Sequence, residues 1–174
     1  MRRALALGLA VLVGATACKQ ADISSEIERE SAAFKQLLPG IATRYEQWTA
    51  AGQADSIASL FEEVGQQLPP NEPAAVGRAA IRDRQARLAT WGTWELHLTP
   101  RSAMAYGPNA ADDGTFTLQF TPGPNAPAGM VAVTDTGKYL AHWLQGADGQ
   151  WRILQLMWNS DLPLPSPPPS SSRR

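Results

Sequence analysis

The sequence predicts an α+β domain in which helices come first and a run of antiparallel strands follows. Two observations predict it. In the first half of the chain, apolar residues recur every three or four positions, which is the period of a helix. After Gly92 the period changes to two, which is the spacing of a half-buried strand. Because helices and strands are segregated along the chain, we expect an antiparallel sheet with the helices covering one face.

The first predicted helix begins near Ile23 and ends before Gly52. Its apolar face is formed by residues at helical spacing, namely Phe34, Leu37, Leu38, Ile41, Tyr45 and Trp48. Pro39-Gly40 falls inside this stretch, and a proline inside a helix removes one backbone hydrogen bond. We therefore predict a kink or a brief interruption at that point.

Two further helices are predicted before the strands. A short one begins with Asp55 as its N-cap, and its apolar stripe is formed by Ile57, Leu60, Phe61 and Val64. The proline-rich segment 68–73 can only be extended or turning. Residues 78–91 then predict an amphipathic third helix with a basic, solvated face.

Five strands are predicted in the second half. They lie at about 94–99, 102–107, 115–121, 138–145 and 151–158. Asp112-Asp113-Gly114 and Asp148-Gly149 are typical of turns between strands. The proline- and glycine-rich stretch 121–131 predicts a loop.

The first twenty residues are typical of an export signal. Arg2 and Arg3 precede an uncharged, largely apolar run that ends at Ala17 and is shorter than the roughly 20 residues of a membrane span. The ending Ala15-Thr16-Ala17-Cys18 resembles a bacterial lipobox. This resemblance implies that residues 1–17 are a signal peptide and that Cys18 is lipidated and becomes the mature N-terminus. An ordinary signal cut after Ala17 is the alternative.

The cysteine content agrees with a lipid anchor. Cys18 is the only cysteine, so no internal disulfide can form, and acylation removes a thiol that would be a hazard in an oxidising compartment. We expect an exported protein that faces the periplasm and is anchored to a membrane, and Lys19 favours the outer membrane. The predicted organisation is a tether at 18–25, a folded domain at 26–162 and a disordered Pro/Ser tail at 163–174.

Charge and motifs exclude several classes of function. Loss of residues 1–17 leaves 13 basic against 16 acidic residues, a net charge of −3. Such a chain, without a basic stripe, is a poor nucleic-acid binder. It contains neither a glycine-rich phosphate loop nor a Gly-x-Ser-x-Gly motif, and we expect no cofactor. The two histidines stand on different predicted strands without a nearby cysteine, which argues against a metal site.

Several segments together resemble SnoaL-like domains, which belong to the superfamily of nuclear transport factor 2 and ketosteroid isomerase. The segments are Ala50-Ala51-Gly52-Gln53-Ala54, Leu68-Pro69-Pro70, Gly77-Arg78-Ala79-Ala80-Ile81, Gly137-Lys138-Tyr139, Asp148-Gly149-Gln150-Trp151-Arg152-Ile153 and Trp158-Asn159-Ser160-Asp161. The similarity is greatest to an exported branch without an assigned function. It implies a cystatin-like, cone-shaped half-barrel, in which a bent antiparallel sheet wraps around three helices and leaves a pocket at its open end.

The resemblance also bears on function. In enzymes of the superfamily an acidic residue, sometimes with His or Tyr, removes a proton next to a carbonyl, whereas other members only bind a ligand. Relatives often carry an acid at the position of Leu156, and leucine cannot take a proton. We therefore expect a pocket without a working general base. The predicted function is binding of a small, mostly apolar ligand, or of a partner, without catalysis.

Two alternatives remain. The first is an isomerase or cyclase that uses His142 or Asp161 as a general base on a carbonyl compound. Against it, His142 can be a half-buried histidine bonded to the backbone, and Asn159 and Asp161 can tie off the end of the last strand. His97 is predicted to be solvated. The second alternative is a homodimeric interaction or scaffold module.

Aromatic residues are the positive evidence for a ligand pocket. The chain has six tryptophans, which suit the walls of small-molecule sites because each combines a large apolar body with one polar group. The competing interpretation is that they build the core. The candidate ligand-binding residues are Tyr45, Trp48, Phe61, Trp94, Tyr139, Trp158 and Asn159.

Overall fold

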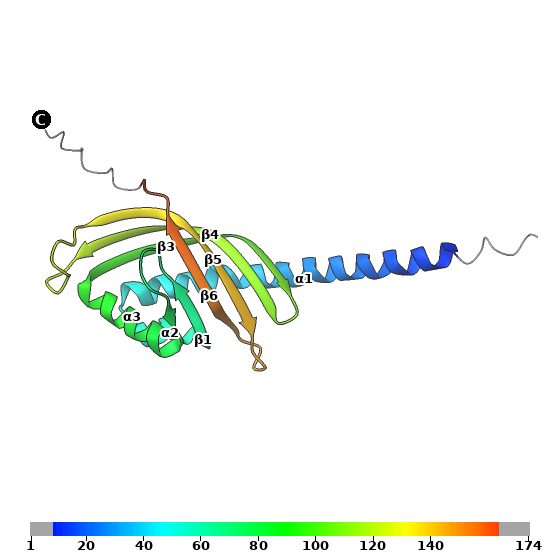
Figure 1. Ribbon diagram of the computed structural model, residues 1–174, viewed down its shortest axis with the longest axis horizontal. Helices are drawn as coiled ribbons and strands as arrows, with labels where there is room; N and C mark the ends of the chain where they lie inside the picture. Colours follow the sequence, from blue (N-terminus) through cyan, green and yellow to red (C-terminus); the bar gives the residue numbers. More distant parts are fainter. Residues whose placement is uncertain (1–8, 164–174) are drawn as a thin grey trace, which may run out of the picture.

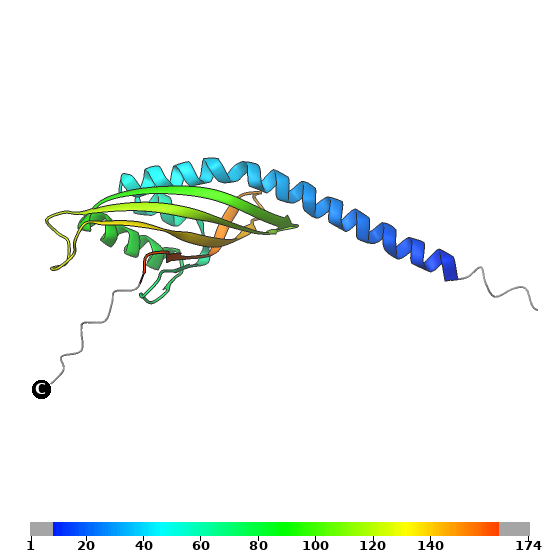
Figure 2. The same cartoon turned by 90° about the horizontal axis from the view of Figure 1, so that it is seen from above.

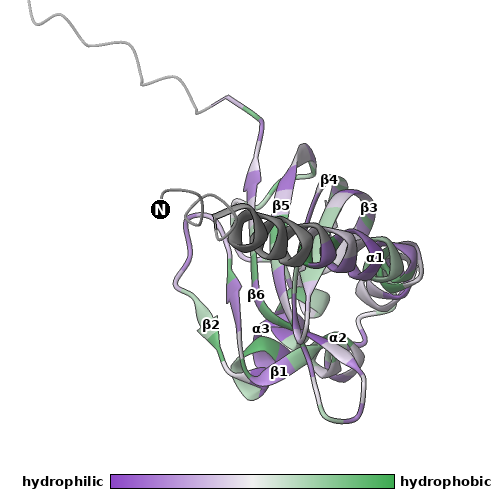
Figure 3. Cartoon of the chain, turned by 90° about the vertical axis from the view of Figure 1, so that its right-hand side faces the viewer, coloured by the Kyte–Doolittle hydropathy of each residue, from purple (hydrophilic) through white to green (hydrophobic). Residues whose placement is uncertain are grey.

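The computed structural model describes residues 9–163, with side chains described from residue 22 onward. The elements are α1 (Leu9–Ala50), α2 (Ala54–Ser59), β1 (Phe61–Leu68), β2 (Ala75–Val76), α3 (Arg78–Trp91), β3 (Gly92–Tyr106), β4 (Asn109–Pro122), β5 (Val133–Gln145) and β6 (Trp151–Ser160). The strands form one sheet in the order β2-β1-β6-β5-β4-β3, which curves over the helices and is not closed (Figure 1). Figure 3 looks along α1, with the strands arranged around it. The predicted α+β fold is confirmed.

The sheet is mixed, because β1 and β6 run parallel while every other neighbouring pair is antiparallel. The sequence prediction missed β1. The helix expected from Asp55 is α2, which ends at Ser59 and has Gln53 at its N-cap. Phe61 instead pairs with Ile153 of β6. Short apolar runs fit a helix or a strand equally well, and here the tertiary pairing decides.

The long strands β3 and β4 also correct the prediction. β3 joins two expected strands through an irregularity between Pro100 and Ser102. The expected turn at 112–114 lies inside β4, and the chain turns at Gly107 instead, where φ is 56°. The predicted turn at Gly149 is confirmed, with a φ of 75°. Continuous pairing to β3 and β5 holds the Asp-Asp-Gly segment extended in spite of its turn-like composition.

α1 is longer than predicted and is not interrupted. It begins at Leu9 and contains Pro39, so the segment expected to be a tether is helical. Figure 2 shows the helix arching over the sheet, and in Figure 1 its N-terminal end extends well beyond it. Pro39 cannot make one backbone hydrogen bond of the helix. Contacts between α1 and β3 on both sides of the proline, at Ser31 and at Glu46, offset that loss.

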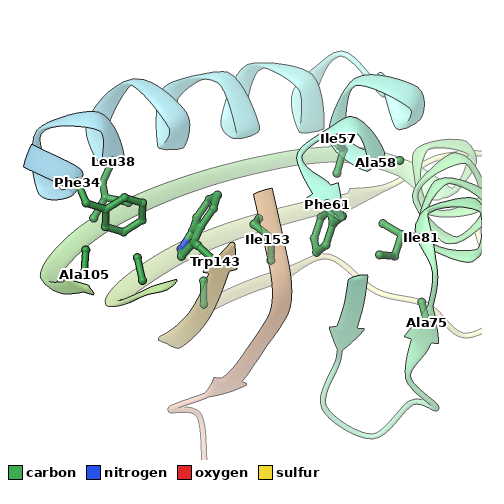
Figure 4. Close-up of a cluster of buried hydrophobic side chains, with 12 residues drawn as sticks. Phe34, Leu38, Ile57, Ala58, Phe61, Ala75, Ile81, Ala105, Trp143 and Ile153 are labelled. Atoms are coloured by element: carbon green, nitrogen blue, oxygen red, sulfur yellow. The ribbon is translucent and has the colours of Figure 1, made fainter. Parts of the chain in front are cut away.

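The hydrophobic core lies between the three helices and the concave face of the sheet (Figure 4). Its largest fully buried apolar side chains are Phe34, Ile57, Phe61 and Ile81. The Phe34 ring meets the Trp143 ring edge-on, with centroids 5.8 Å apart. This packing anchors α1 on β5.

Some expectations fall outside the described residues. These are the N-terminal part of the signal peptide 1–17, the side chain of Cys18 and the tail from residue 164. Within the described part of the chain, none of the helices combines the length and apolar character that crossing a membrane requires.

Candidate functional site

An apolar cavity of about 330 Å³ lies between α1, α3 and the concave face of the sheet. Period-two alternation on β3 directs Trp94, Leu96 and Leu98 into it. The aromatic residues of its wall are Tyr45, Trp91, Trp94, Phe116, Tyr139, Trp143 and Trp158. Met130, from the loop between β4 and β5, also reaches the wall. The cavity is therefore built mostly from large apolar side chains that the sheet presents on one face.

The structure places some of the predicted ligand-binding residues in this wall and others elsewhere. Those in the wall are Tyr45, Trp94, Tyr139 and Trp158. Phe61 is fully buried in the core, and Trp48 packs against the core. Asn159 is exposed, and its side-chain amide donates to the carbonyl of Ser160 at 3.3 Å. Size and aromatic character identified wall residues, but they could not separate the wall from the core.

The predicted general bases lie outside the cavity. His142 lies between Ala141 and Trp143, which both line the cavity, so its side chain is on the opposite face of β5. Asp161 follows β6 and forms an exposed ion pair with Lys138. Neither can act on a molecule held in the cavity.

The other histidine is solvated, as predicted. The side chain of His97 is 69% exposed, and its Nδ1 lies 3.2 Å from the Glu46 carboxylate. Within the described residues no three His, Cys, Asp or Glu side chains form a group that could hold a metal ion.

A bulge in β6 changes which residues reach the cavity. The alternation of the sequence puts Ile153 and Leu156 on opposite faces of the strand. The register against β5 shifts between His142 and Trp143, so that Leu154 is an extra residue on β6. Both Ile153 and Leu156 therefore line the cavity.

An acid is nevertheless present, because Asp112 of β4 lines the cavity and is only 3% exposed. The indole Nε1 of Trp143 donates to its Oδ1 at 2.6 Å, and the hydroxyl of Tyr139 donates to its Oδ2 at 3.0 Å. Burial raises the pKa of the Asp112 carboxyl, and the two hydrogen bonds oppose that rise. The pocket that we expected to lack a working general base therefore contains a buried carboxyl group.

The side chain of Tyr139 reaches Asp112 by passing over Gly114 on the neighbouring strand. Gly114 is the partner of Tyr139 in the ladder between β4 and β5. A Cβ at position 114 would lie 2.5 Å from Cε1 and 2.6 Å from Oη of Tyr139. Burial and the neighbouring Asp112 carboxylate raise the pKa of Tyr139 well above its usual 10, so the phenol stays protonated and acts as a donor. The absence of a side chain at Gly114 thus creates the Tyr139–Asp112 contact.

A second polar group in the wall is a chain of neutral hydrogen bonds. Gln85 Nε2 donates to Gln67 Oε1 at 3.1 Å, and Gln67 Nε2 donates to the Tyr45 hydroxyl at 3.3 Å. Gln67 is fully buried, and burial raises the pKa of Tyr45 to about 12. These side chains satisfy one another and hold α1, β1 and α3 together at this part of the wall.

The basic residue of the wall is already paired. The Nε and Nη2 atoms of Arg84 lie 3.2 Å and 3.3 Å from the two carboxylate oxygens of Glu72. The guanidinium also lies over the Trp158 ring, 5.5 Å from its centroid. Chemically, the cavity therefore offers an apolar space, a neutralised Arg–Glu pair and one buried carboxyl group.

Sequence analysis missed Asp112 because Asp-Asp-Gly is a common turn sequence. A signal for it was present. Alternate positions from 112 to 120 include Phe116, Leu118 and Phe120, which all point inward, and extending the period of two backwards brings Asp112 to the same face.

Comparison with known proteins yields matches among solved structures only. No family model matches the chain, and no curated protein matches it. An NTF2-like superfamily protein from Salmonella enterica serovar Typhimurium aligns at a TM-score of 0.63 and 16% identity, over 77% of this chain and 95% of that one. An NTF2-like protein with a cystatin-like fold from Novosphingobium aromaticivorans aligns at a TM-score of 0.55 and 18% identity, over 88% of this chain and 90% of that one.

A third neighbour is a ketosteroid isomerase-like protein from Erwinia carotovora atroseptica, with a TM-score of 0.61 and 14% identity over 74% of this chain and 96% of that one. The chain has the NTF2-like fold. The resemblance read from the sequence is thus confirmed at the level of the fold, including the cystatin-like cone. An NTF2-like fold does not by itself decide between binding and catalysis, so that choice rests on the cavity.

Proposed function

We propose that this NTF2-like protein binds a small, mostly apolar molecule in its cavity. The observation that carries the proposal is the wall, in which aromatic and aliphatic side chains from α1, α3 and four strands enclose about 330 Å³. Ligand sites typically have volumes from about 300 Å³ upward and combine apolar walls with a few convergent polar groups. Tyr45, Arg84, Asp112 and Tyr139 are such groups here.

The experiment compares two tryptophan substitutions on neighbouring residues of β3. Leu96 lines the cavity, whereas Glu95 points to solvent on the other face. The full chain carrying Cys18→Ser, which cannot be acylated, is titrated with the uncharged fluorescent probe N-phenylnaphthylamine. We expect saturable binding that Leu96→Trp weakens by at least about tenfold, equivalent to 1.4 kcal/mol. Glu95→Trp should bind like the parent, and equal loss in both variants would contradict the proposal.

We place this function at a membrane surface in the periplasm, on the strength of the N-terminal sequence. Lipidation of Cys18 would hold the protein there, and the extension of α1 beyond the sheet would set the cone apart from the lipid (Figure 1). Lys19 favours the outer membrane. Mass spectrometry of the exported protein tests the anchor, and an unmodified Cys18 or a mature N-terminus at another residue would contradict it.

A homodimer is a further proposal about partners. Leu140 and Met157 pair directly on the outer face of β5 and β6, and they are 48% and 47% exposed. A second copy covering this apolar pair would remove it from water. Sedimentation of the Cys18→Ser chain at micromolar concentration tests the proposal, and a monomer there would exclude it.

A second candidate function is proton transfer to or from a carbonyl compound, and Asp112 is the observation that favours it. A carboxyl group in an apolar site, with its pKa raised by burial, binds a proton more tightly than an exposed carboxyl and can exchange it with a bound molecule. In this second candidate function, Asp112 is the general base, in place of His142 or Asp161. The test incubates the protein with a panel of ketones in deuterated water and measures the uptake of deuterium at the carbon next to each ketone's carbonyl group. Exchange that Asp112→Asn abolishes and His142→Ala retains would establish the enzyme.

A further inference from the structure

We infer that the cavity takes an organic cation, an apolar body that carries a protonated amine, and that the ammonium group pairs with the Asp112 carboxylate. This inference rests on the proposed binding function and adds the chemical class of the ligand. It follows from three observations: the partners of Asp112, the charges of the cavity wall and the direction of the nearby donors.

Asp112 has only neutral partners. Its two oxygens accept from the Trp143 indole and the Tyr139 phenol, and within the described residues it takes part in no ion pair. Other aspartates in the structure, such as Asp148 and Asp161, pair with Arg152 and Lys138. A buried carboxylate without a counter-charge is costly, and a bound cation would remove that cost.

The rest of the wall does not supply the missing positive charge. Arg84 is the basic residue of the wall, and both of its bonded nitrogens are directed at Glu72. With that pair neutral, ionised Asp112 leaves the wall with one negative charge in excess. An anionic ligand would be repelled, and a neutral ligand would leave the charge uncompensated.

The donors around Asp112 face the carboxyl and not the ligand. The Tyr139 hydroxyl and the Trp143 indole both give their protons to Asp112, so this part of the wall offers acceptor oxygens to a guest. Each carboxylate oxygen can accept more than one hydrogen bond. A ligand that donates, above all an ammonium group, fits such a centre, whereas a carbonyl group meets no free donor there.

The aromatic wall suits a cation as well. The Trp158 ring already carries the guanidinium of Arg84 at 5.5 Å, and Tyr139 pairs with Trp158 across the β5–β6 ladder. Aromatic faces attract cations most strongly where water is excluded. The cavity wall therefore already holds one cation, that of Arg84, against an aromatic face.

The experiment uses four probes with one apolar body and different polar groups: adamantylmethylamine, adamantylmethanol, adamantane carboxylate and adamantanone. Binding to the full Cys18→Ser chain is measured by calorimetry at neutral pH. We expect the amine to bind at least about tenfold more tightly than the alcohol. Asp112→Asn should abolish this preference while still binding the alcohol. The matched control, Asp113→Asn, alters the neighbouring acid on the other face of β4 and should retain the preference.

The outcomes separate the inference from the proposed function. If the alcohol, ketone or carboxylate binds as tightly as the amine, or if the preference survives in Asp112→Asn, the cation inference is wrong and ligand binding stands. If none of the four probes binds, the proposed function fails and the inference fails with it. Should Asp112→Asn not fold, the indole N–H signal of Trp143 in the parent decides by NMR. The amine must shift it more than the alcohol does, and equal shifts overturn the inference.

Discussion

Asp112 lies in an environment that carboxyl groups rarely occupy. A carboxyl group is rarely this deeply buried without a cationic partner, and here two neutral donors hold it in place. The raised pKa means that the folded protein takes up a proton more readily than the unfolded chain does. The stability gained from that proton is complete below the usual pKa of 3.8 and is lost as the pH rises through the raised value.

Asp112→Asn should therefore stabilise the protein at neutral pH. The asparagine can still accept from Trp143 and can donate to the Tyr139 oxygen, but it carries no charge to desolvate. We expect the melting temperature of the variant to exceed that of the parent at pH 7, and the difference to shrink as the pH falls towards 3.8. A difference that is constant with pH would show that Asp112 does not titrate between the two states as described.

Gly114→Ala should disrupt the contact between Tyr139 and Asp112. The new methyl group would lie about 2.5 Å from the Tyr139 ring and from the Thr99 carbonyl oxygen, so the ring and the neighbouring strand must both move. Overpacking of this kind costs about 1–3 kcal/mol of unfolding free energy. Gly40→Ala is the control, and it should raise the unfolding free energy. Nothing lies within 4 Å of a Cβ at this helical position, and alanine stabilises a helix by roughly 0.5–1 kcal/mol relative to glycine. Chemical denaturation measures both, and equal effects would contradict the packing at Gly114.

At the scale of elements, α1 protects the free edge of the sheet. β3 is an edge strand, and side chains of α1 accept hydrogen bonds from its backbone amides. Glu46 Oε1 accepts from the amide of Leu98 at 2.7 Å, and Ser31 Oγ accepts from the amide of Ala105 at 2.9 Å. Just after the strand, Glu30 Oε2 accepts from the amide of Gly107 at 2.7 Å. These bonds satisfy amides that would otherwise be open to pairing with another chain.

Replacing these acceptors should loosen β3 without changing the cavity. Ser31→Ala and Glu46→Ala should each cost about 1 kcal/mol, the typical net value of one hydrogen bond. The amides of Ala105 and Leu98 should then exchange with deuterium faster than in the parent. Glu28→Ala, an exposed change on the same helix, should leave both rates unaltered. Unchanged exchange in all three variants would show that α1 does not protect the edge.

The elements also show what the sequence could predict. The β3 segment around Trp94 was predictable, because an unbroken period of two runs through it. α3 was predictable as a helix, but its basic face is not wholly solvated as expected, because Arg84 is buried and lines the cavity. β1 was not predictable, because it pairs with β2 and with β6, which lies far along the chain. The cavity residue Asp112 was hidden for a related reason, since its turn-like neighbours are held extended by strands on both sides.

At the scale of the whole molecule, the cone is asymmetric in its filling. Near Phe34 and Trp143 the space between α1 and the sheet is packed, whereas towards α3 it remains open as the cavity. The composition of the chain indicated enough aromatic residues for both regions. It could not assign each residue to one region, because Trp48 and Trp158 are the same residue type and differ only in their position within the cone.

The most direct test of the central claim is an NMR titration of the tryptophan indole N–H signals with N-phenylnaphthylamine. The tryptophans that line the cavity are Trp91, Trp94, Trp143 and Trp158, whereas Trp48 and Trp151 do not line it. If the cavity is a ligand site, the first four signals should shift together along one saturation curve while the other two stay nearly fixed. Shifts spread evenly over all six signals, or none at saturating probe, would contradict the account.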